Sequence, residues 1–501
     1  MRSKLPPFYV VLAVVTLMMM GCTSSLTTAP SSPGKGALYT LMTDTPACDV
    51  LGFRVEMSTL SLIRQGSTTT TTVFPPSVTV NPNFVSPQVE VTRLEDFTKI
   101  LNLERIPAGT YDQAVVDLVM TNGATYDPSA NPPVTTFSPT ATTSSVTVNI
   151  NPPVVITPGG VSAILLDLNL QKSLPANAEG QLTGTFTPLV AVTSLTPSAS
   201  GGFGEMDDID GFTESVTPVI ATPGSSFTGS FTLQTFPPNG PALTVNLTNS
   251  TQLFGTPALN QLLTPSYVES DGYLDSQGNL VANSVQVESR EDVNSNTVAY
   301  LGPVLTVTRG AGGNLSQFTM LVRDTQPDVS SSILPETPAI VSVSGSTTFQ
   351  VAAPPANFAM LPFNPSNLAP GQEVAVSGPF TPNTSAAVTA LQPVAVNADS
   401  VFLRLATLQG NFSGLIQAES DDKTGAFQLA VCSQVFQAEP TMVITDNTTN
   451  FVDVTGLTEL TPQAELLVKG LAFYEPQATT INTISVPAGT LVVLAKQVHA
   501  L

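Results

Sequence analysis

The stretch Leu243-Thr244-Val245-Asn246-Leu247-Thr248 alternates apolar and polar side chains over its whole length. Because successive side chains of a β-strand point to opposite faces of a sheet, this alternation predicts a half-buried strand. Residues 146–150 show the same pattern, whereas helical periodicity is nearly absent from the chain. We therefore expect an all-β protein, in which residues 94–103 form a short helix or an irregular edge segment.

Turn-forming sequences separate several of the expected strands. Three of them are Asp275-Ser276-Gln277-Gly278, residues 310–314 (Gly-Ala-Gly-Gly-Asn) and residues 421–425 (Asp-Asp-Lys-Thr-Gly). Asp, Asn and Gly readily adopt the backbone conformations of tight turns, so these segments predict hairpin loops.

The C-terminal part of the chain repeats one order of features three times. A Phe at the start of a strand is followed by a Thr in a polar-to-apolar step and then by a strand that ends in Gly. The members are Phe231, Thr251 and Gly272; Phe318, Thr347 and Gly378; and Phe427, Thr449 and Gly470. From Thr to Gly the spacing is 21, 31 and 21 residues, because the middle copy carries an insertion around residues 354–365.

A further strand is expected after each repeated Gly, at residues 280–287, 387–396 and 490–498. About five short strands in each copy are enough to close a small barrel without exposed edges. We predict three tandem OB-like β-barrels at residues 205–290, 291–398 and 399–501.

The first folded unit is predicted at residues 37–175. Its expected strands lie at residues 37–47, 50–62, 114–120 and 162–170. Two segments rich in Thr, Ser and Pro, at residues 67–87 and 126–143, are expected to form long surface loops.

Three motifs in this first unit carry a resemblance to a known family. They are Thr43-Asp44-Thr45-Pro46-Ala47, Pro107-Ala108-Gly109-Thr110-Tyr111 and Asp167-Leu168-Asn169-Leu170-Gln171-Lys172-Ser173. The unit resembles the bacterial domain of unknown function 4382, a family found in exported lipoproteins. This resemblance implies a prealbumin-like or immunoglobulin-like β-sandwich. The three repeats resemble the domain of unknown function 5666, which often follows such a unit.

The N-terminus has the order of a secretory signal peptide at residues 1–21. Arg2 and Lys4 precede an apolar run at residues 8–20, which is too short to span a bilayer as a permanent helix. Met19-Met20-Gly21-Cys22 resembles a bacterial lipobox, with Met19 where Leu is usual. The resemblance implies that Cys22 is diacylated and becomes the mature N-terminus; an ordinary cleaved signal peptide is the alternative.

Residues 22–36 are predicted to form a flexible tether, because Ser, Thr, Pro and Gly bury too little surface to offset the entropy of ordering. Thr23 follows Cys22, where an Asp is linked with retention in the inner membrane of some bacteria. We therefore expect a lipid-anchored protein of the outer membrane, facing the periplasm or the cell surface.

The charge of the chain argues against nucleic acid as a partner. The formal net charge is −21, and only 11% of the residues are charged. Phosphate binding requires clustered Lys and Arg, which the chain lacks. The expected partners are the membrane, through the lipid anchor, and an envelope polysaccharide or a surface protein.

Apart from Cys22, the chain contains only Cys48 and Cys432. They are expected in different units, and their spacing cannot decide whether they pair. We expect two unpaired buried thiols; a disulfide in an oxidising compartment is the alternative.

Groups suited to catalysis are scarce. His499 is the only histidine and is expected in a surface tail at the C-terminus, which leaves no Ser-His-Asp or Cys-His arrangement. Paired carboxylates for glycoside hydrolysis would have to come from two clusters: Glu205, Asp207, Asp208 and Asp210; and Glu419, Asp421 and Asp422. Because the chain has no Trp and eight Tyr, it lacks the aromatic walls usual in sugar clefts.

Metal sites are also not expected. Asp208 and Asp210 precede Gly211 as in part of an EF-hand loop, but Met206 and Thr217 occupy positions where acidic ligands should stand. Asp44 and Asp49 flank a Pro turn, where a carboxylate more often accepts backbone N–H bonds. We predict no cofactor and no metal.

These observations favour a non-catalytic cell-envelope lipoprotein that acts as a surface scaffold, adhesion or binding module. One alternative is a lipoprotein that binds polysaccharide or another polymer through its barrel faces. A carboxylate-based hydrolase is the other alternative.

Overall fold

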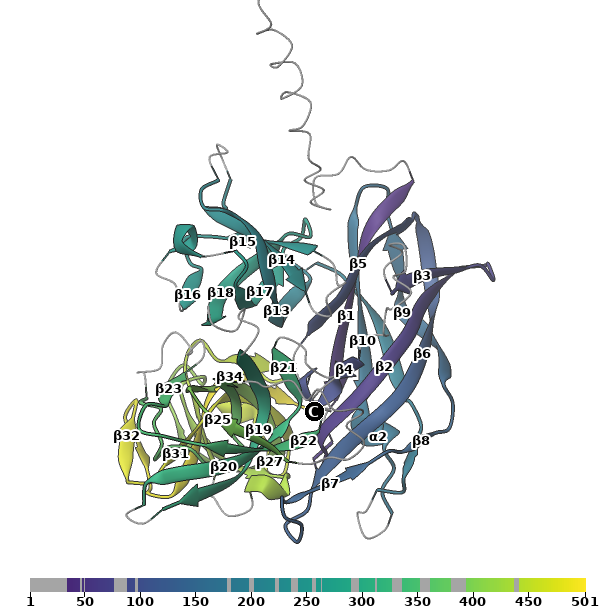
Figure 1. Ribbon diagram of the computed structural model, residues 1–501. Coiled ribbons are helices and arrows are strands. Elements are labelled where there is room, and N and C mark those ends of the chain that lie inside the picture. Colours follow the sequence, from purple (N-terminus) through teal and green to yellow (C-terminus); the bar gives the residue numbers. More distant parts are fainter. Residues whose placement is uncertain are drawn as a thin grey trace, which may run out of the picture.

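The computed structural model describes residues 34–501, apart from residues 46, 49, 76–87, 95–97, 178–181, 198–201, 221–224, 236–241, 255–257, 263, 290–296, 311–312, 327–335, 352–360, 380–392 and 437–440. The predicted signal peptide and Cys22 lie outside the described residues. Almost every described element is a β-strand, so the predicted all-β class is confirmed (Figure 1). Among the described residues, no helix has the length and apolarity needed to cross a bilayer.

The first unit is a β-sandwich. In one of its sheets, β1 (Lys35–Thr45) pairs in antiparallel fashion with β5 (Lys99–Pro107) and in parallel with β10 (Val161–Asn169). β12 (Val190–Leu195) pairs with β10, so the sandwich extends to Leu195, beyond the boundary predicted at residue 175. The helix considered for residues 94–103 is wrong, because β5 is an edge strand with one register shift against β1.

The second sheet is built on two long strands, β2 (Val50–Arg64) and β6 (Gly109–Tyr126), and on β9 (Ser145–Ile156). β9 also pairs with β12 through Ile150 and Val192, so it joins the two sheets at one side. Residues 67–87 and 126–143 are not simply loops. They contain the short strands β3 (Thr70–Phe74), β7 (Val134–Phe137) and β8 (Thr140–Ala141).

Barrel 1 follows the sandwich. Its five main strands are β13 (Gly204–Thr217), β14 (Gly229–Thr235), β15 (Ala242–Leu247), β17 (Tyr267–Leu274) and β18 (Leu280–Ser289). They lie in the order β15-β14-β13-β17-β18, and parallel pairing of β15 with β18 closes the barrel. The third and fifth strands are parallel and all other neighbours antiparallel, which is an OB-like arrangement.

Barrel 3 repeats this topology. Its strands are β27 (Leu405–Ala418), β28 (Gly425–Val431), β29 (Thr441–Thr445), β31 (Glu465–Glu475) and β34 (Thr490–Ala500). They lie in the order β29-β28-β27-β31-β34, closed by the parallel pair β29–β34. A small hairpin of β32 (Thr479–Ile481) and β33 (Ile484–Val486) is inserted before the last strand.

Barrel 2 has the same order but a divided last strand. Its first four strands are β19 (Thr297–Arg309), β20 (Leu315–Val322), β22 (Thr337–Ser342) and β24 (Glu373–Pro379). β25 (Val394–Asn397) then pairs in parallel with β22, and β26 (Ser400–Leu403) pairs with β24. Barrel 2 therefore extends to Leu403, beyond the boundary predicted at residue 398, and part of the strand predicted at residues 387–396 lies outside the described residues.

The repeated Thr fastens a crossing segment to each barrel. Thr251, Thr347 and Thr449 precede or begin the short strands β16 (Gln252–Phe254), β23 (Thr348–Val351) and β30 (Asn450–Val452). Each hydroxyl donates a hydrogen bond to the carbonyl of an alanine: Thr251 to Ala282 at 2.7 Å, Thr347 to Ala398 at 2.7 Å and Thr449 to Ala495 at 2.9 Å. Each Thr also accepts a backbone N–H from the residue three positions earlier. The three copies are thus equivalent in structure.

The repeated Gly marks a close approach between strands. A Cβ at Gly272 would lie 2.2 Å from the carbonyl oxygen of Val281, and one at Gly470 would lie 2.3 Å from that of Leu494. Gly378 approaches the carbonyl of Asn397 in the same way. The repeated Phe fills the barrel interiors, since Phe231, Phe318 and Phe427 are all buried.

The four units pack in two pairs. Tyr39 and Leu41 of β1 lie in one apolar core with Phe231 and Leu233 of barrel 1. Barrels 2 and 3 share a second core, which contains Met320 and Val376 of barrel 2 and Ile444 and Phe473 of barrel 3. We call the sandwich with barrel 1 the N-terminal half, and barrels 2 and 3 the C-terminal half (Figure 1).

Candidate functional site

A cavity of about 110 Å³ lies where the two halves meet. All four units contribute to its wall. The sandwich supplies Cys48 and Leu51, barrel 1 supplies Glu269 and Asp271, barrel 2 supplies Arg323 and Glu373, and barrel 3 supplies Gln409 and Cys432. A single water needs about 10–15 Å³ by a comparable measure, so the space admits several waters or one small ligand.

Charged side chains of opposite sign line this cavity. Arg404, between barrels 2 and 3, forms an ion pair with Glu269 of barrel 1. Arg323 Nη1 lies 3.2 Å from Glu373 Oε2 within barrel 2, and Arg323 Nε donates to the carbonyl of Leu51 in the sandwich. Both ion pairs are largely removed from water, so the charges in each pair must neutralise one another, and the Arg404–Glu269 pair does so between units.

A buried carboxylate lies at the same boundary. Glu336 precedes β22, is 1% exposed, and its Oε1 is 3.6 Å from Arg54 Nε of the sandwich. Glu90 of the sandwich also faces it, and accepts hydrogen bonds from the backbone N–H of Phe53 and from Thr92. Burial, followed by the charge of Glu90, raises the pKa of Glu336 to about 9 against the opposing effect of Arg54. Glu336 therefore keeps its proton at neutral pH.

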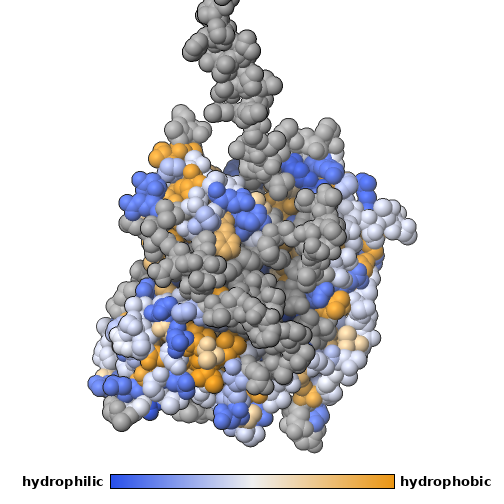
Figure 2. Space-filling view, in the orientation of Figure 1, coloured by the Kyte–Doolittle hydropathy of each residue, from blue (hydrophilic) through white to orange (hydrophobic). Residues whose placement is uncertain are grey.

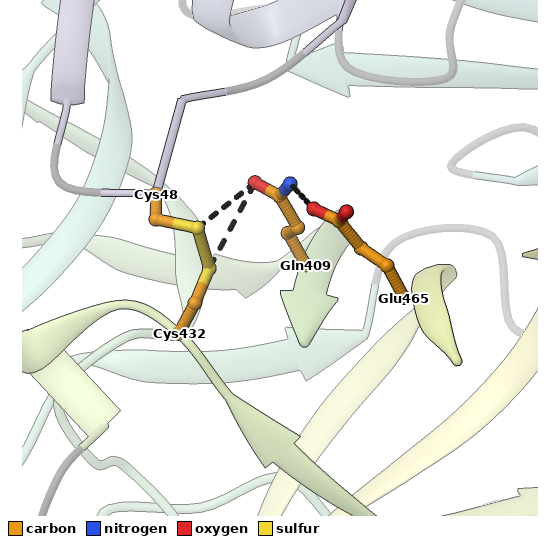
Figure 3. The surroundings of a disulfide bond; sticks show 4 residues. All are labelled: Cys48, Gln409, Cys432 and Glu465. Carbon is orange, nitrogen blue, oxygen red and sulfur yellow. Dashed lines mark hydrogen bonds between the residues drawn. A yellow bond between two sulfur atoms is a disulfide. The ribbon is translucent and has the colours of Figure 1, made fainter. Parts of the chain in front are cut away.

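Cys48 and Cys432 form a disulfide across the same cavity, so the prediction of two unpaired thiols is wrong. Their Cα atoms are 5.5 Å apart, although 384 residues separate them in sequence. Figure 3 shows the amide oxygen of Gln409 facing both sulfur atoms, at 3.1 Å from Cys48 Sγ and 3.8 Å from Cys432 Sγ. The amide nitrogen of Gln409 donates to Glu465 Oε1, which fixes the orientation of the amide.

The carboxylates of the second predicted cluster, residues 419–422, accept hydrogen bonds in and around a turn. Asp421 accepts the backbone N–H groups of Lys423 and Thr424, and these bonds lower its pKa. Asp422 accepts from the backbone N–H and the hydroxyl of Thr458. Glu419 accepts from Gln417. These carboxylate oxygens therefore stabilise the hairpin between β27 and β28 and its contact with Thr458.

The backbone of the first predicted carboxylate cluster, residues 205–210, lies in β13. Glu205 and Asp210 pair with Tyr273 and Glu269 of β17, and a register shift separates Met206 from Ile209. The side chains of Glu205, Asp207, Asp208 and Asp210 lie outside the described residues. Asp49, considered with Asp44 for a cation, also lies outside them.

His499 is not in a frayed tail. It lies in β34, where it pairs with Leu467 of β31 and Val452 of β30. Its Nε2 is 3.1 Å from Asp453 Oδ2. The last residue, Leu501, donates its N–H to Glu465, so the C-terminus is held in the sheet.

The motifs that carry the family resemblance hold the sandwich together. Asn169 caps α2 (Leu170–Ser173) by accepting the N–H of Lys172, and Asp44 accepts the N–H of Leu170 at 3.3 Å. The hydroxyl of Ser173 accepts the N–H of Leu189, and buried Tyr111 donates to the carbonyl of Pro107 at 2.9 Å. Their roles are structural, and Asp44 serves the backbone as expected.

Within the described part of the chain, no group of three or more His, Cys, Asp or Glu side chains is placed to hold a metal ion. Figure 2 shows scattered groups of hydrophilic residues on the face in view and an apolar patch over the C-terminal half. The cavity therefore stands out as the place where charged, polar and redox-active groups converge. Sequence reasoning missed it because its residues come from all four units.

Residues 35–184 match the model of a family described as Domain of unknown function (DUF4382). This match confirms the resemblance inferred for the first unit and covers most of the sandwich. No curated protein matches the chain. The class defined by fold and comparison is thus an all-β protein whose N-terminal unit is similar to that family.

Proposed function

We propose that the chain is a non-catalytic cell-envelope lipoprotein, anchored to the outer membrane through Cys22, in which four packed β units act as a scaffold or binding module. The observation that carries the proposal is the Cys48–Cys432 disulfide between the first and last units. Disulfides persist in oxidising compartments such as the periplasm and the cell surface, which a chain with an export signal reaches.

The use of the charged side chains supports a scaffold over a hydrolase. Asp421 and Asp422 hold turn backbone, and Arg404 and Glu269 neutralise each other between units. The equivalent Thr–Ala hydrogen bonds of the barrels further support the proposal that they are three copies of the module resembling the domain of unknown function 5666.

The anchor is tested by feeding an alkyne analogue of palmitate to cells that make the full chain. We expect label on the wild-type chain, which fractionates with the outer membrane, and none on Cys22→Ser. Ser24→Ala, two residues away, serves as the matched control and should be labelled like wild type. An unlabelled, soluble wild-type chain would overturn the lipoprotein proposal.

Binding is tested by thermal unfolding of the chain from Thr23 onward with a panel of envelope polysaccharides and isolated surface proteins. A ligand at 100 times its dissociation constant should stabilise the protein by about 2.7 kcal/mol. A shift with any member supports a binding module and identifies the partner class. If no member shifts the transition, the binding role is lost and the scaffold role remains.

A further inference from the structure

The cavity gives small molecules in solution a route to the disulfide. Cys48 and Cys432 both line it, and both are half-buried. A volume of about 110 Å³ admits a molecule with a few heavy atoms. A thiol carried on a folded protein or a long polymer does not fit in that space.

Near the disulfide, the halves are joined by a small apolar cluster and by polar contacts. The apolar cluster at this place is small: Leu51 and Ala124 of the sandwich meet Leu305, Leu321 and Val435 of the C-terminal half. Tyr126, Val134 and Phe436 pack against this cluster, and polar contacts such as the bond from Arg323 to the carbonyl of Leu51 lie beside it. Hydrogen bonds between groups that water can also satisfy add little net stability.

We propose that the cavity is a thiol–disulfide exchange site, in which a small thiol reduces the Cys48–Cys432 bond and releases the two halves from each other. The thiolate of a first small molecule attacks one sulfur, forms a mixed disulfide and releases the other cysteine as a thiolate, which takes a proton. A second small thiolate attacks its counterpart in the mixed disulfide and frees the remaining cysteine, which is protonated in turn. In balance, the protein disulfide and two small thiols become two protein thiols and one small disulfide.

Gln409 is placed to stabilise the reduced state. Its amide oxygen lies 3.1 Å and 3.8 Å from the two sulfur atoms, within reach of an S–H donor, whereas the disulfide carries no proton to donate. The bond from the Gln409 amide nitrogen to Glu465 holds this oxygen in position. Gln409 is thus a positioning residue that favours the dithiol.

The test compares the rates at which two added thiols reduce the disulfide of the full oxidised chain in native buffer. One is 2-mercaptoethanol, and the other is a thiol on a long polyethylene glycol chain at the same concentration. Free cysteines are alkylated and located by peptide mass mapping, and small-angle scattering gives the radius of gyration. We expect 2-mercaptoethanol to free both Cys48 and Cys432 and to increase the radius while the β circular dichroism is kept. The polymer thiol should react about tenfold or more slowly, because exchange depends on access.

Two variants in β27 test whether small thiols reach the disulfide through the cavity. Ala406→Phe fills the cavity and should slow reduction by 2-mercaptoethanol, whereas Leu415→Phe, at an exposed position of β27, should not. Gln409→Leu should shift the equilibrium toward the disulfide by about two- to tenfold, the range expected for one hydrogen bond.

The proposal fails if the two cysteines stay oxidised until the chain unfolds, or if both thiols react equally fast. It also fails if full reduction leaves the radius of gyration unchanged. The double variant Cys48→Ser with Cys432→Ser should have the larger radius without any thiol and should not respond to one.

Discussion

The interface within the N-terminal half and the junction between the halves are built on opposite principles. Tyr39 and Leu41 lie in a continuous apolar core with barrel 1, whereas the junction holds Arg404, Glu269 and a disulfide around a cavity. Apolar burial does not depend directly on pH or redox state. Buried charges and thiols do depend on them. We therefore expect the apolar core within the N-terminal half to be insensitive to pH and redox state, and the stability of the junction to depend on both.

A polar bond that crosses the apolar interface is itself insensitive to pH. Tyr39 Oη donates to the carbonyl of Gly278, in the hairpin between β17 and β18, at 2.8 Å. Burial, and secondarily the charge of Asp275, raises the pKa of Tyr39 above its ordinary value, so the hydroxyl keeps its proton. The contrast with the junction thus extends to the hydrogen bonds.

The largest effect is expected from breaking the buried ion pair at the junction. Arg404→Met leaves Glu269 without its partner in a site largely shielded from water, and should destabilise the junction by about 3–5 kcal/mol. The double variant Arg404→Met with Glu269→Leu removes both charges and should recover most of that loss. Urea unfolding curves measure both changes. Equal losses in the single and double variants would contradict the role assigned to the pair.

A change in the apolar interface should act without any dependence on thiols. Leu41→Ala removes a fully buried side chain and should cost about 2–5 kcal/mol, according to how far the core can collapse. The loss, measured by urea unfolding, should be the same with the Cys48–Cys432 bond intact or reduced, because independent sites are additive. A loss that changes on reduction would show that the two interfaces are coupled.

The barrels were predictable because their signals are local. The order of Phe, Thr and Gly in each copy reflects a filled core, a hydroxyl on an alanine carbonyl and a close strand approach. A second set of glycines, Gly211, Gly302 and Gly410 on the first strands, has the same function and was missed. The repeated Thr that made the first set of glycines recognisable in the sequence does not precede these glycines at a fixed spacing.

The junction was not predictable from the sequence. Cys48 with Cys432 and Glu269 with Arg404 become neighbours only after the units pack. No spacing rule connects residues of different units, so the spacing of the two cysteines could not decide whether they pair. His499 was misplaced for a related reason, because the pairing of β34 with β30 and β31 holds the last residues in a sheet.

The third effect, which is the smallest over a single pH unit, separates the two interfaces by pH. Glu336 binds its proton more tightly in the folded chain than in the unfolded chain, because burial and Glu90 raise its pKa from 4.5 to about 9. Stability is therefore full below the unfolded pKa and falls as the pH rises between these values, by at most about 1.4 kcal/mol per pH unit for one proton. Glu336→Gln, which carries no titrating proton, should flatten that slope in urea unfolding between these values.

Glu419→Gln is the matched control, since Glu419 is exposed on a turn of barrel 3 and its replacement should leave the slope unchanged. Leu41→Ala should lower stability equally at each pH, because the substitution removes apolar contacts and no titrating group. A slope that persists in Glu336→Gln would assign the pH dependence to another group. If the slope of stability against pH disappears only in Glu336→Gln, the pH dependence of stability arises at the junction between the halves.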